Sequence, residues 1–289
     1  MIDANTNLSE YKIIGVHPMT GNLGAEVSNV DLDQLDDKTF AEIKKAFLEY
    51  QVIVFRDQNV KYKSHIDFGK RFGDLYIHPY ISPIEEYPEL IRLLKKPTDK
   101  VNNGGTWHFD LTFVDEPPMC SILRLIDVPK TGGDTMFCNM YSAYDALSDS
   151  MKIYLEGLQG VHTSAQLFGP TGYYTINKKA TSMAQIPDVG SFVALHPLVR
   201  THPETGRKCL FVNPGYIERI YNIPNRESDH ILNFLNLHCA QAEFSTRVKW
   251  EKDTITMWDN RCAMHHAIND YQGQRREGVR VTVSGGQPV

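Results

Sequence analysis

The chain has 289 residues, of which 42% are hydrophobic and 22% are charged, an ordinary composition for a folded globular protein. The 30 basic and 35 acidic side chains leave a net charge of −5, which argues against a general nucleic-acid binder and is too small for a disordered acidic chain. This length fits either two domains or one large enzyme domain.

The five cysteines are widely spaced and form no Cys-x-x-Cys motif. We therefore expect free thiols in a reducing compartment, not a disulfide framework or a cysteine-based zinc site. The first residues lack the pattern of a signal peptide, and no stretch reaches the roughly 20 apolar residues of a membrane span. These features predict a soluble cytoplasmic protein with no membrane partner.

Short apolar or alternating runs predict strands. In chain order these are residues 11–16, 52–55, 90–94, 119–126, 134–138, 208–212, 247–250, 254–258 and 279–283. Apolar residues spaced three or four apart predict helices over 37–50, 64–72, 142–158 (one or two helices) and 227–240. We expect the second helix to end at Gly73 and the last to begin near a capping Ser228.

The order of these elements predicts the fold class. Strands dominate, helices are few, and the repeating strand–helix rhythm of a doubly wound sheet or a TIM barrel is absent. A mainly β sandwich or jelly roll with helices packed outside fits better. Residues 163–190 have weak periodicity and predict a long loop of the kind that forms lids.

Pairs of the form His-x-Asp are candidate metal ligands, because residues i and i+2 of a strand point to the same side. His65 and Asp67 fall in a predicted helix, where such residues diverge by about 200° around the axis, so we expect them at the surface or at a cap. His108 and Asp110 follow a glycine-rich loop and fit the edge of a strand beside an open site.

A related pair, His202 and Glu204, lies in a segment with the composition of a tight turn, which disfavours a metal role. Near the C-terminus, His265 and His266 are adjacent and would point in opposite directions on an extended backbone, so at most one can face a site. If this segment and the basic strand that follows paired as a hairpin, a histidine and the arginines would converge. The alternative is a solvated basic loop.

Several separated motifs together resemble the taurine dioxygenase family of Fe(II)- and 2-oxoglutarate-dependent oxygenases. They are Trp-His-Phe-Asp at 107–110, Thr-Gly-Gly-Asp-Thr at 131–135, and Trp-Asp-Asn-Arg at 258–261 followed by His265, Arg276 and Arg280. Stretches at 51–58, 71–79 and 196–213 extend the resemblance, in order, over most of the chain.

The resemblance implies a double-stranded β-helix, or jelly-roll, core with flanking helices. It implies a single domain over 1–289 with a lid insertion around 163–190. It assigns His108, Asp110 and His265 as ligands of Fe(II), with His265 preferred over His266 by its distance from the Trp-Asp-Asn-Arg motif. Arg276, assisted by the Thr135 hydroxyl, would hold the distal carboxylate of 2-oxoglutarate, a task that suits the fork of a guanidinium.

The reaction implied by the resemblance uses O2 and 2-oxoglutarate, yields succinate and CO2, and activates a C–H bond of a small substrate. Arg280 and His78 match the positions that bind the sulfonate in taurine enzymes, which favours an anionic substrate. Phe168 and Tyr216 match pocket-lining positions. Asn103 is a further candidate for substrate binding.

Two departures from the taurine pattern argue against taurine itself. Ile81 stands where taurine enzymes have a tyrosine, and Gly104 falls where an asparagine is expected, unless Asn103 serves instead. Sulfonates, sulfate esters, carboxylates and amino-acid-like substrates all stay open. So do a tailoring oxygenase or desaturase of the same family, a homo-oligomer, a zinc hydrolase with the same three ligands, and a jelly-roll binding protein without turnover.

Overall fold

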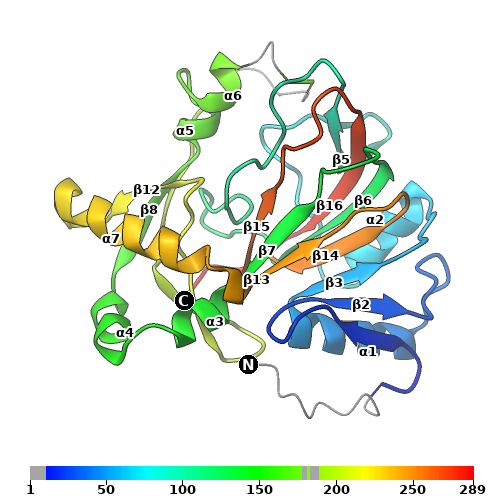
Figure 1. Ribbon diagram of the computed structural model, residues 1–289, viewed down its shortest axis with the longest axis horizontal. Coiled ribbons are helices and arrows are strands. Elements are labelled where there is room, and N and C mark those ends of the chain that lie inside the picture. Colours follow the sequence, from blue (N-terminus) through cyan, green and yellow to red (C-terminus); the bar gives the residue numbers. More distant parts are fainter. Residues whose placement is uncertain (1–10, 178–180, 183–188) are drawn as a thin grey trace.

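Strands dominate the computed structural model, which describes residues 11–177, 181–182 and 189–289 (Figure 1). The strands are β1 (Gly15–Pro18), β2 (Ala25–Ser28), β3 (Val52–Phe55), β4 (Pro83–Ile84), β5 (Tyr87–Lys95), β6 (Cys120–Asp127), β7 (Thr135–Asn139), β8 (Gln159–Thr163), β9 (Val193–Pro197), β10 (Val199–Thr201), β11 (Lys208–Leu210), β12 (Ile217–Ile220), β13 (Ser245–Val248), β14 (Ile255–Asp259), β15 (Ala263–Ala267) and β16 (Arg276–Val283). The helices are α1 (Asp37–Tyr50), α2 (Tyr62–Lys70), α3 (Met140–Asp145), α4 (Asp149–Leu155), α5 (Ala165–Phe168), α6 (Tyr173–Ile176), α7 (Asn225–Cys239) and the 3-10 helix η3 (Ala242–Phe244). The architecture is mixed α/β, mainly strands in several sheets.

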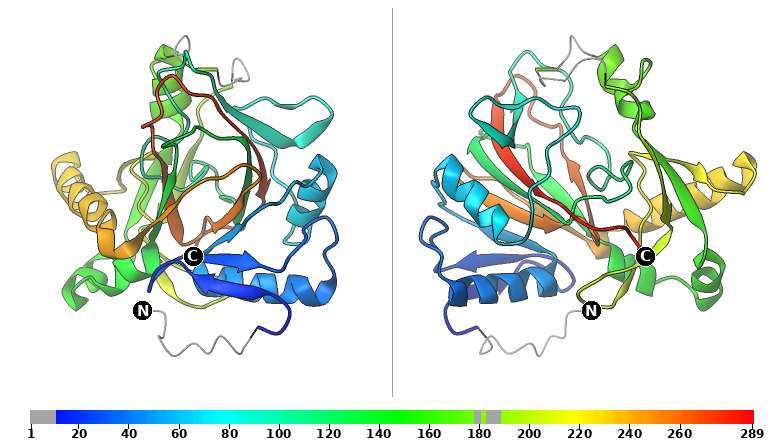
Figure 2. Two further views of the ribbon diagram at one scale, coloured as in Figure 1. Left: turned by 45° about the vertical axis from the view of Figure 1, so that its right-hand side comes forward. Right: turned by 180° about the vertical axis from the view of Figure 1, so that it is seen from behind.

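Two sheets carry the centre of the molecule (Figure 2). The larger has eight strands in the order β1-β2-β3-β14-β6-β16-β5-β4, and the smaller has the order β13-β7-β15. Leu123 of β6, Trp258 of β14 and Phe137 of β7 belong to one buried cluster, so the two sheets pack face to face. The site described below lies in the space that these sheets enclose.

Strand β3 shows why the large sheet is buried on both faces. Val52 and Val54 point into the cluster between the two sheets, whereas Ile53 and Phe55 pack under helix α1. Alternation along a strand sends neighbouring residues to opposite faces, so a strand covered on both sides is apolar throughout. The helix ends at Gln51, which adopts a left-handed conformation (φ 60°) and begins the turn into β3.

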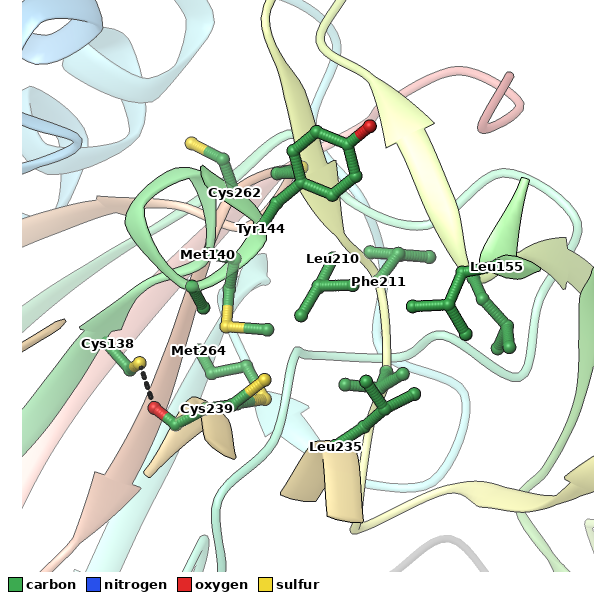
Figure 3. Packing of buried hydrophobic residues seen from close by; sticks show 14 of the residues in the cluster. Cys138, Met140, Tyr144, Leu155, Leu210, Phe211, Leu235, Cys239, Cys262 and Met264 are labelled. Atoms are coloured by element: carbon green, nitrogen blue, oxygen red, sulfur yellow. Dashed lines mark hydrogen bonds between the residues drawn. The ribbon is translucent and has the colours of Figure 1, made fainter. Parts of the chain in front are cut away.

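A further sheet, β12-β8-β9, and helices α3 and α7 lie beside the small sheet. Their shared core is rich in sulfur: Figure 3 shows Cys138, Cys239 and Met264 among leucines, with the Cys138 thiol donating a hydrogen bond to the Cys239 carbonyl (2.7 Å). All five cysteines are free and buried, which confirms the prediction of free thiols.

The structure confirms the predicted helix over 37–50 and resolves 142–158 into α3 and α4. Both predicted caps are wrong. Helix α2 ends with Arg71 in a right-handed conformation before Gly73 is reached, and Ser228 lies inside α7, where its hydroxyl accepts from the Ile220 amide. Pro224 precedes α7 instead.

Most predicted strands exist with boundaries moved by a few residues, but the first begins at Gly15, not residue 11. Strands β2, β4, β8, β9, β10, β12 and β15 were not predicted. The segment 163–190, predicted as a loop, contains the short helices α5 and α6, and its residues 178–180 and 183–188 lie outside the described part. In the described ranges, no helix is long and apolar enough to cross a bilayer.

Candidate active site

Two histidines far apart in the sequence are joined through their backbones. The His108 amide donates to the His265 carbonyl (2.9 Å) and the His265 amide donates to the His108 carbonyl (2.8 Å), an isolated antiparallel bridge. This bridge places the two imidazole rings with their centroids 4.0 Å apart. The prediction that only one of the adjacent histidines faces a site is confirmed, because His266 packs against Trp107 instead.

The predicted strand under His108 and Asp110 is wrong, because His108 makes only that bridge and Asp110 starts a turn. The turn passes through Leu111 in a left-handed conformation (φ 55°). Asn260 holds it: the side-chain carbonyl accepts from the Asp110 amide (2.7 Å), and the side-chain NH2 donates to the Asp110 carbonyl (3.0 Å). A single buried amide therefore fixes the backbone on both sides of the Asp110 side chain.

The Asp110 carboxylate is buried but well supplied with donors. Arg280 Nη1 donates to Oδ1 (2.9 Å), and the Ser121 hydroxyl donates to Oδ2 (2.7 Å). Burial alone would raise the pKa of Asp110, but the Arg280 guanidinium, helped by His265 and His108, outweighs burial and holds the pKa well below its ordinary value. Asp110 is therefore an anion at neutral pH.

Both histidines are neutral, because burial lowers the pKa of His108 and lowers that of His265 well below its ordinary value. His108 Nδ1 lies 2.7 Å from the Thr106 carbonyl and must carry the proton of that hydrogen bond, which leaves Nε2 with a lone pair. The Nε2 atoms of both rings lie 3.9 Å from Asp110 Oδ1. All three donor atoms lie within 4.8 Å of one another.

Two imidazole nitrogens and one carboxylate oxygen, converging with no hydrogen bond between them, suit a divalent cation. This donor set with open positions is typical of non-haem Fe(II) oxygenases. The residues present therefore fit the ion that the sequence motifs predict.

A second group, formed by His202, Asp259 and Cys262, does not fit a metal ion. Both Asp259 oxygens already accept from Arg261, whose Nε and Nη2 lie 2.8 and 2.7 Å away, and His202 Nε2 lies 3.1 Å from Oδ2. The Arg261 backbone amide also donates to Oδ1 (2.9 Å), so all four acceptor positions of this carboxylate are in use and none is left to bind a cation. As predicted, the pair His202 and Glu204 does not form a metal site, since Glu204 bonds Arg261 (2.8 Å).

The other His-x-Asp pair is also structural, but its predicted surface placement is wrong for His65. This histidine is buried in α2, and its Nε2 lies 3.1 Å from the Ile122 carbonyl. Only Asp67 lies at the surface, where it pairs with Lys63.

The histidine pair and Asp110 open into a cavity of about 420 Å³. All the predicted site residues line it: His78, Asn103, His108, Asp110, Thr135, Phe168, Tyr216, His265, Arg276 and Arg280. The predicted hairpin is wrong, because β15 pairs with β7 while β16 pairs with β5 and β6. The histidine and the arginines converge nevertheless, since they face each other from opposite sheets.

Arg276 is one of the residues that line the cavity. Its Nε donates to the Gly133 carbonyl (3.1 Å), and the guanidinium lies 5.6 Å from the centre of the Trp250 ring. Trp250 Nε1 donates to the Thr135 hydroxyl (2.9 Å), which keeps its own proton free to donate. Within the described part of the chain, Arg276 forms no ion pair, so Arg276 and Thr135 offer a cation and a hydroxyl to an anion.

His78 also lines the cavity. Its Nδ1 accepts from the backbone amides of Tyr80 (3.1 Å) and Ile81 (3.0 Å), which places the proton on Nε2. Burial, and then the Arg280 charge, lower the pKa of His78 to about 3, so it is a neutral donor. Two further polar atoms, Arg280 Nε and Asn103 Oδ1, are buried without a hydrogen-bond partner among the described residues.

Several residues of this site had no role in the predictions made from the sequence. Asn260 belongs to the Trp-Asp-Asn-Arg motif, but nothing in the sequence indicates that it bonds the Asp110 backbone. Ser121, which donates to the Asp110 carboxylate, is a single polar residue in an otherwise apolar strand and gives no signal of that role. Tyr174, whose hydroxyl accepts from the Gly104 amide (3.2 Å), comes from the segment predicted to lack structure. Lys95, at the end of β5, also lines the cavity.

The profile of the family described as "Taurine catabolism dioxygenase TauD, TfdA family" matches residues 15–282. The chain belongs to this family. It is 31% identical to the alpha-ketoglutarate-dependent sulfate ester dioxygenase of Pseudomonas putida, over 96% of this chain and 91% of that protein. It is 33% identical to the alpha-ketoglutarate-dependent 2,4-dichlorophenoxyacetate dioxygenase of Cupriavidus pinatubonensis, over 92% of this chain and 95% of that protein.

Among solved structures, a taurine dioxygenase from Burkholderia xenovorans superposes with a TM-score of 0.82 at 33% identity, over 96% of this chain and 93% of that one. The protein is thus an alpha-ketoglutarate (2-oxoglutarate)-dependent dioxygenase of the TauD/TfdA family, and the family implies Fe(II). The alternatives of a zinc hydrolase and of a binding protein without turnover are set aside.

Proposed function

We propose that His108, Asp110 and His265 hold Fe(II), and that Arg276 and Thr135 bind the distal carboxylate of 2-oxoglutarate. The observation that carries this proposal is the cavity itself, because the three candidate metal ligands and an unpaired guanidinium line the same cavity. When bound, Fe(II) and 2-oxoglutarate supply the oxidation: O2 is consumed, succinate and CO2 are formed, and one oxygen atom enters a substrate C–H bond.

The chain itself positions the reactants. Asn260 fixes the Asp110 backbone, Ser121 orients its carboxylate, and the proton on His108 Nδ1 leaves Nε2 free to bind metal. Phe168 stacks on Tyr80 with ring centroids 4.3 Å apart, which forms an apolar wall that excludes water beside the polar groups.

We propose a small anionic substrate of the sulfonate, sulfate ester or aryloxyalkanoate class. Arg280 keeps a free Nε–H and His78 a free Nε2–H at the cavity, and these two donors suit an oxyanion. Ile81 presents an apolar side chain where a taurine enzyme has a tyrosine, so a substrate with a hydrocarbon body fits better than one with an amine. The relatives named above act on substrates of these classes.

The test is a succinate-release screen with Fe(II), 2-oxoglutarate and O2 over alkyl sulfonates, alkyl sulfates, aryloxyacetates and neutral hydrocarbons of equal size. We expect release well above background with at least one anionic class, and a large rise in KM for that substrate in Arg280→Met. A preference for neutral substrates would contradict the proposal. A desaturase would show succinate release with a product that carries no new oxygen.

The finer features of the fold are also proposals. The two facing sheets are consistent with a double-stranded β-helix, or jelly-roll, core of one domain over residues 1–289. A lid around 163–190, a cytoplasmic location and a homo-oligomer stay predictions.

A further inference from the structure

A buried lysine on the cavity wall has no role in the function proposed above. Lys95, at the end of β5, is only 4% exposed, and its ammonium nitrogen has no hydrogen-bond partner among the described residues. The nitrogen lies 4.4 Å from the centre of the Tyr271 ring. Lysines are rarely buried without a partner, because an unpaired ammonium loses its hydration.

The register of the sheet places this lysine beside Arg276. The two residues are directly opposite each other on the antiparallel strands β5 and β16, and opposite residues point to the same face. Both line the cavity. Tyr271, which lies under the Lys95 ammonium, is also close to Arg276. A Cβ atom added to Gly133 would lie 3.2 Å from the Tyr271 ring and 3.4 Å from the Arg276 side chain.

The acidic side chains nearby are already occupied. Asp99 accepts hydrogen bonds from the Lys96 amide (2.8 Å) and from the Ser182 hydroxyl. Burial lowers the pKa of Lys95, and the charge of Asp99 opposes this only in part. Asp134 accepts from Arg247 (2.6 Å). Among the described residues, no carboxylate accepts a hydrogen bond from Lys95 or Arg276. This wall of the cavity therefore presents two cations with unused donors.

We propose that Lys95 and Arg276 form a two-cation receptor for the distal carboxylate of 2-oxoglutarate. The inference rests on the proposed place of that carboxylate at Arg276. A carboxylate has about four acceptor positions, so the guanidinium fork and one ammonium proton can be satisfied together. Lys95 thus acts as a specificity residue that favours 2-oxo acids with a second carboxylate.

The test measures binding, not turnover. The full chain is loaded with Mn(II) without O2 and titrated calorimetrically with 2-oxoglutarate and with 2-oxovalerate, in which a methyl group replaces the distal carboxylate. We expect Lys95→Met to weaken 2-oxoglutarate binding by about tenfold and 2-oxovalerate binding by less than about twofold. Lys95→Arg restores most of the affinity, and Lys96→Met, an exposed neighbour, binds both ligands as the wild type does.

Equal loss of both ligands in Lys95→Met, or no loss of either, would overturn the inference. Arg276→Met separates this outcome from failure of the proposed function. If Arg276→Met loses 2-oxoglutarate selectively while Lys95→Met does not, only the role of Lys95 is wrong. If Arg276→Met binds 2-oxoglutarate normally, the proposed carboxylate site is itself wrong.

Discussion

At the scale of single residues, the site depends on backbone contacts that hold the metal ligands. Asn260 is fully buried, and its side-chain amide bonds both the N–H and the carbonyl of Asp110. The backbone bridge between His108 and His265 fixes the relative positions of the two histidines. Ligand geometry is therefore specified by main-chain hydrogen bonds as much as by the ligands themselves.

Asn260→Ala should weaken metal binding although Asn260 is not a ligand. The substitution leaves the Asp110 N–H and carbonyl without partners and frees the turn, so we expect a loss in Mn(II) affinity of about 10- to 100-fold, as for other residues that orient ligands. Calorimetric titration with Mn(II), alongside thermal unfolding of the metal-free protein, measures both effects. Unchanged metal affinity in a folded variant would show that Asn260 does not position Asp110.

The adjacent histidines offer a matched pair of substitutions. His265→Gln should abolish Mn(II) binding, because it removes one of three ligands, whereas His266→Gln should change the affinity by less than about threefold. His266 touches Trp107 and lies outside the ligand group. Equal effects of the two substitutions would refute the assignment.

At the scale of the elements, strand β16 carries both cavity arginines, four residues apart, on one face. Its backbone has an irregularity between Glu277 and Gly278 where it pairs with β6. A Cβ atom at Gly278 would lie 2.5 Å from the Leu125 side chain and 2.8 Å from the Arg124 carbonyl. Only glycine lets the two strands approach this closely.

Gly278→Ala should therefore push β16 away from β6. We expect a loss of unfolding free energy of about 1–3 kcal/mol and weaker 2-oxoglutarate binding, because the displaced strand carries the arginines. Gly286→Ala is the control, since a Cβ atom there meets nothing within 4 Å. Chemical denaturation of both variants measures the difference. A Gly278→Ala protein as stable as the control would disprove the close packing.

The sequence predicted elements well where a periodic apolar pattern is long, and poorly where tertiary contacts decide. Helix α1 was placed at its observed ends because its apolar stripe is a local feature of the sequence. Strand β15 was missed because its two histidines break the apolar pattern, and the packing that buries them comes from β7 and β14. The motif residues were found from the sequence. The position of Lys95 opposite Arg276 and the hydrogen bonds from Asn260 to the Asp110 backbone were not, because they depend on strand pairing and tertiary contacts that a single sequence does not show.

At the scale of the whole molecule, three buried neutral histidines make folding sensitive to acid. Burial lowers the pKa of His65 to about 4 and the pKa values of His78 and His162 to about 3. In the unfolded chain each titrates near 6.5, so below that pH unfolding takes up protons. These histidines therefore cost the folded state nothing by titration above about pH 6.5, and they destabilise it progressively as the pH falls towards 4.

The unfolding free energy should thus fall between pH 6.5 and 4.5, with each histidine adding a slope of up to about 1.4 kcal/mol per pH unit. His65→Gln preserves a donor to the Ile122 carbonyl and removes one titrating group. Guanidinium unfolding across this range should show about one proton less taken up by the variant. An unchanged slope would mean that His65 is not neutral in the folded protein.

The most direct test of the account is the visible spectrum of the protein with Fe(II) and 2-oxoglutarate in the absence of O2. If His108, Asp110 and His265 hold the iron and 2-oxoglutarate chelates it there, a weak charge-transfer band appears in the wild type and in His266→Gln and is absent in His108→Ala. No band in the wild type, or an undiminished band in His108→Ala, would contradict the assignment of the site.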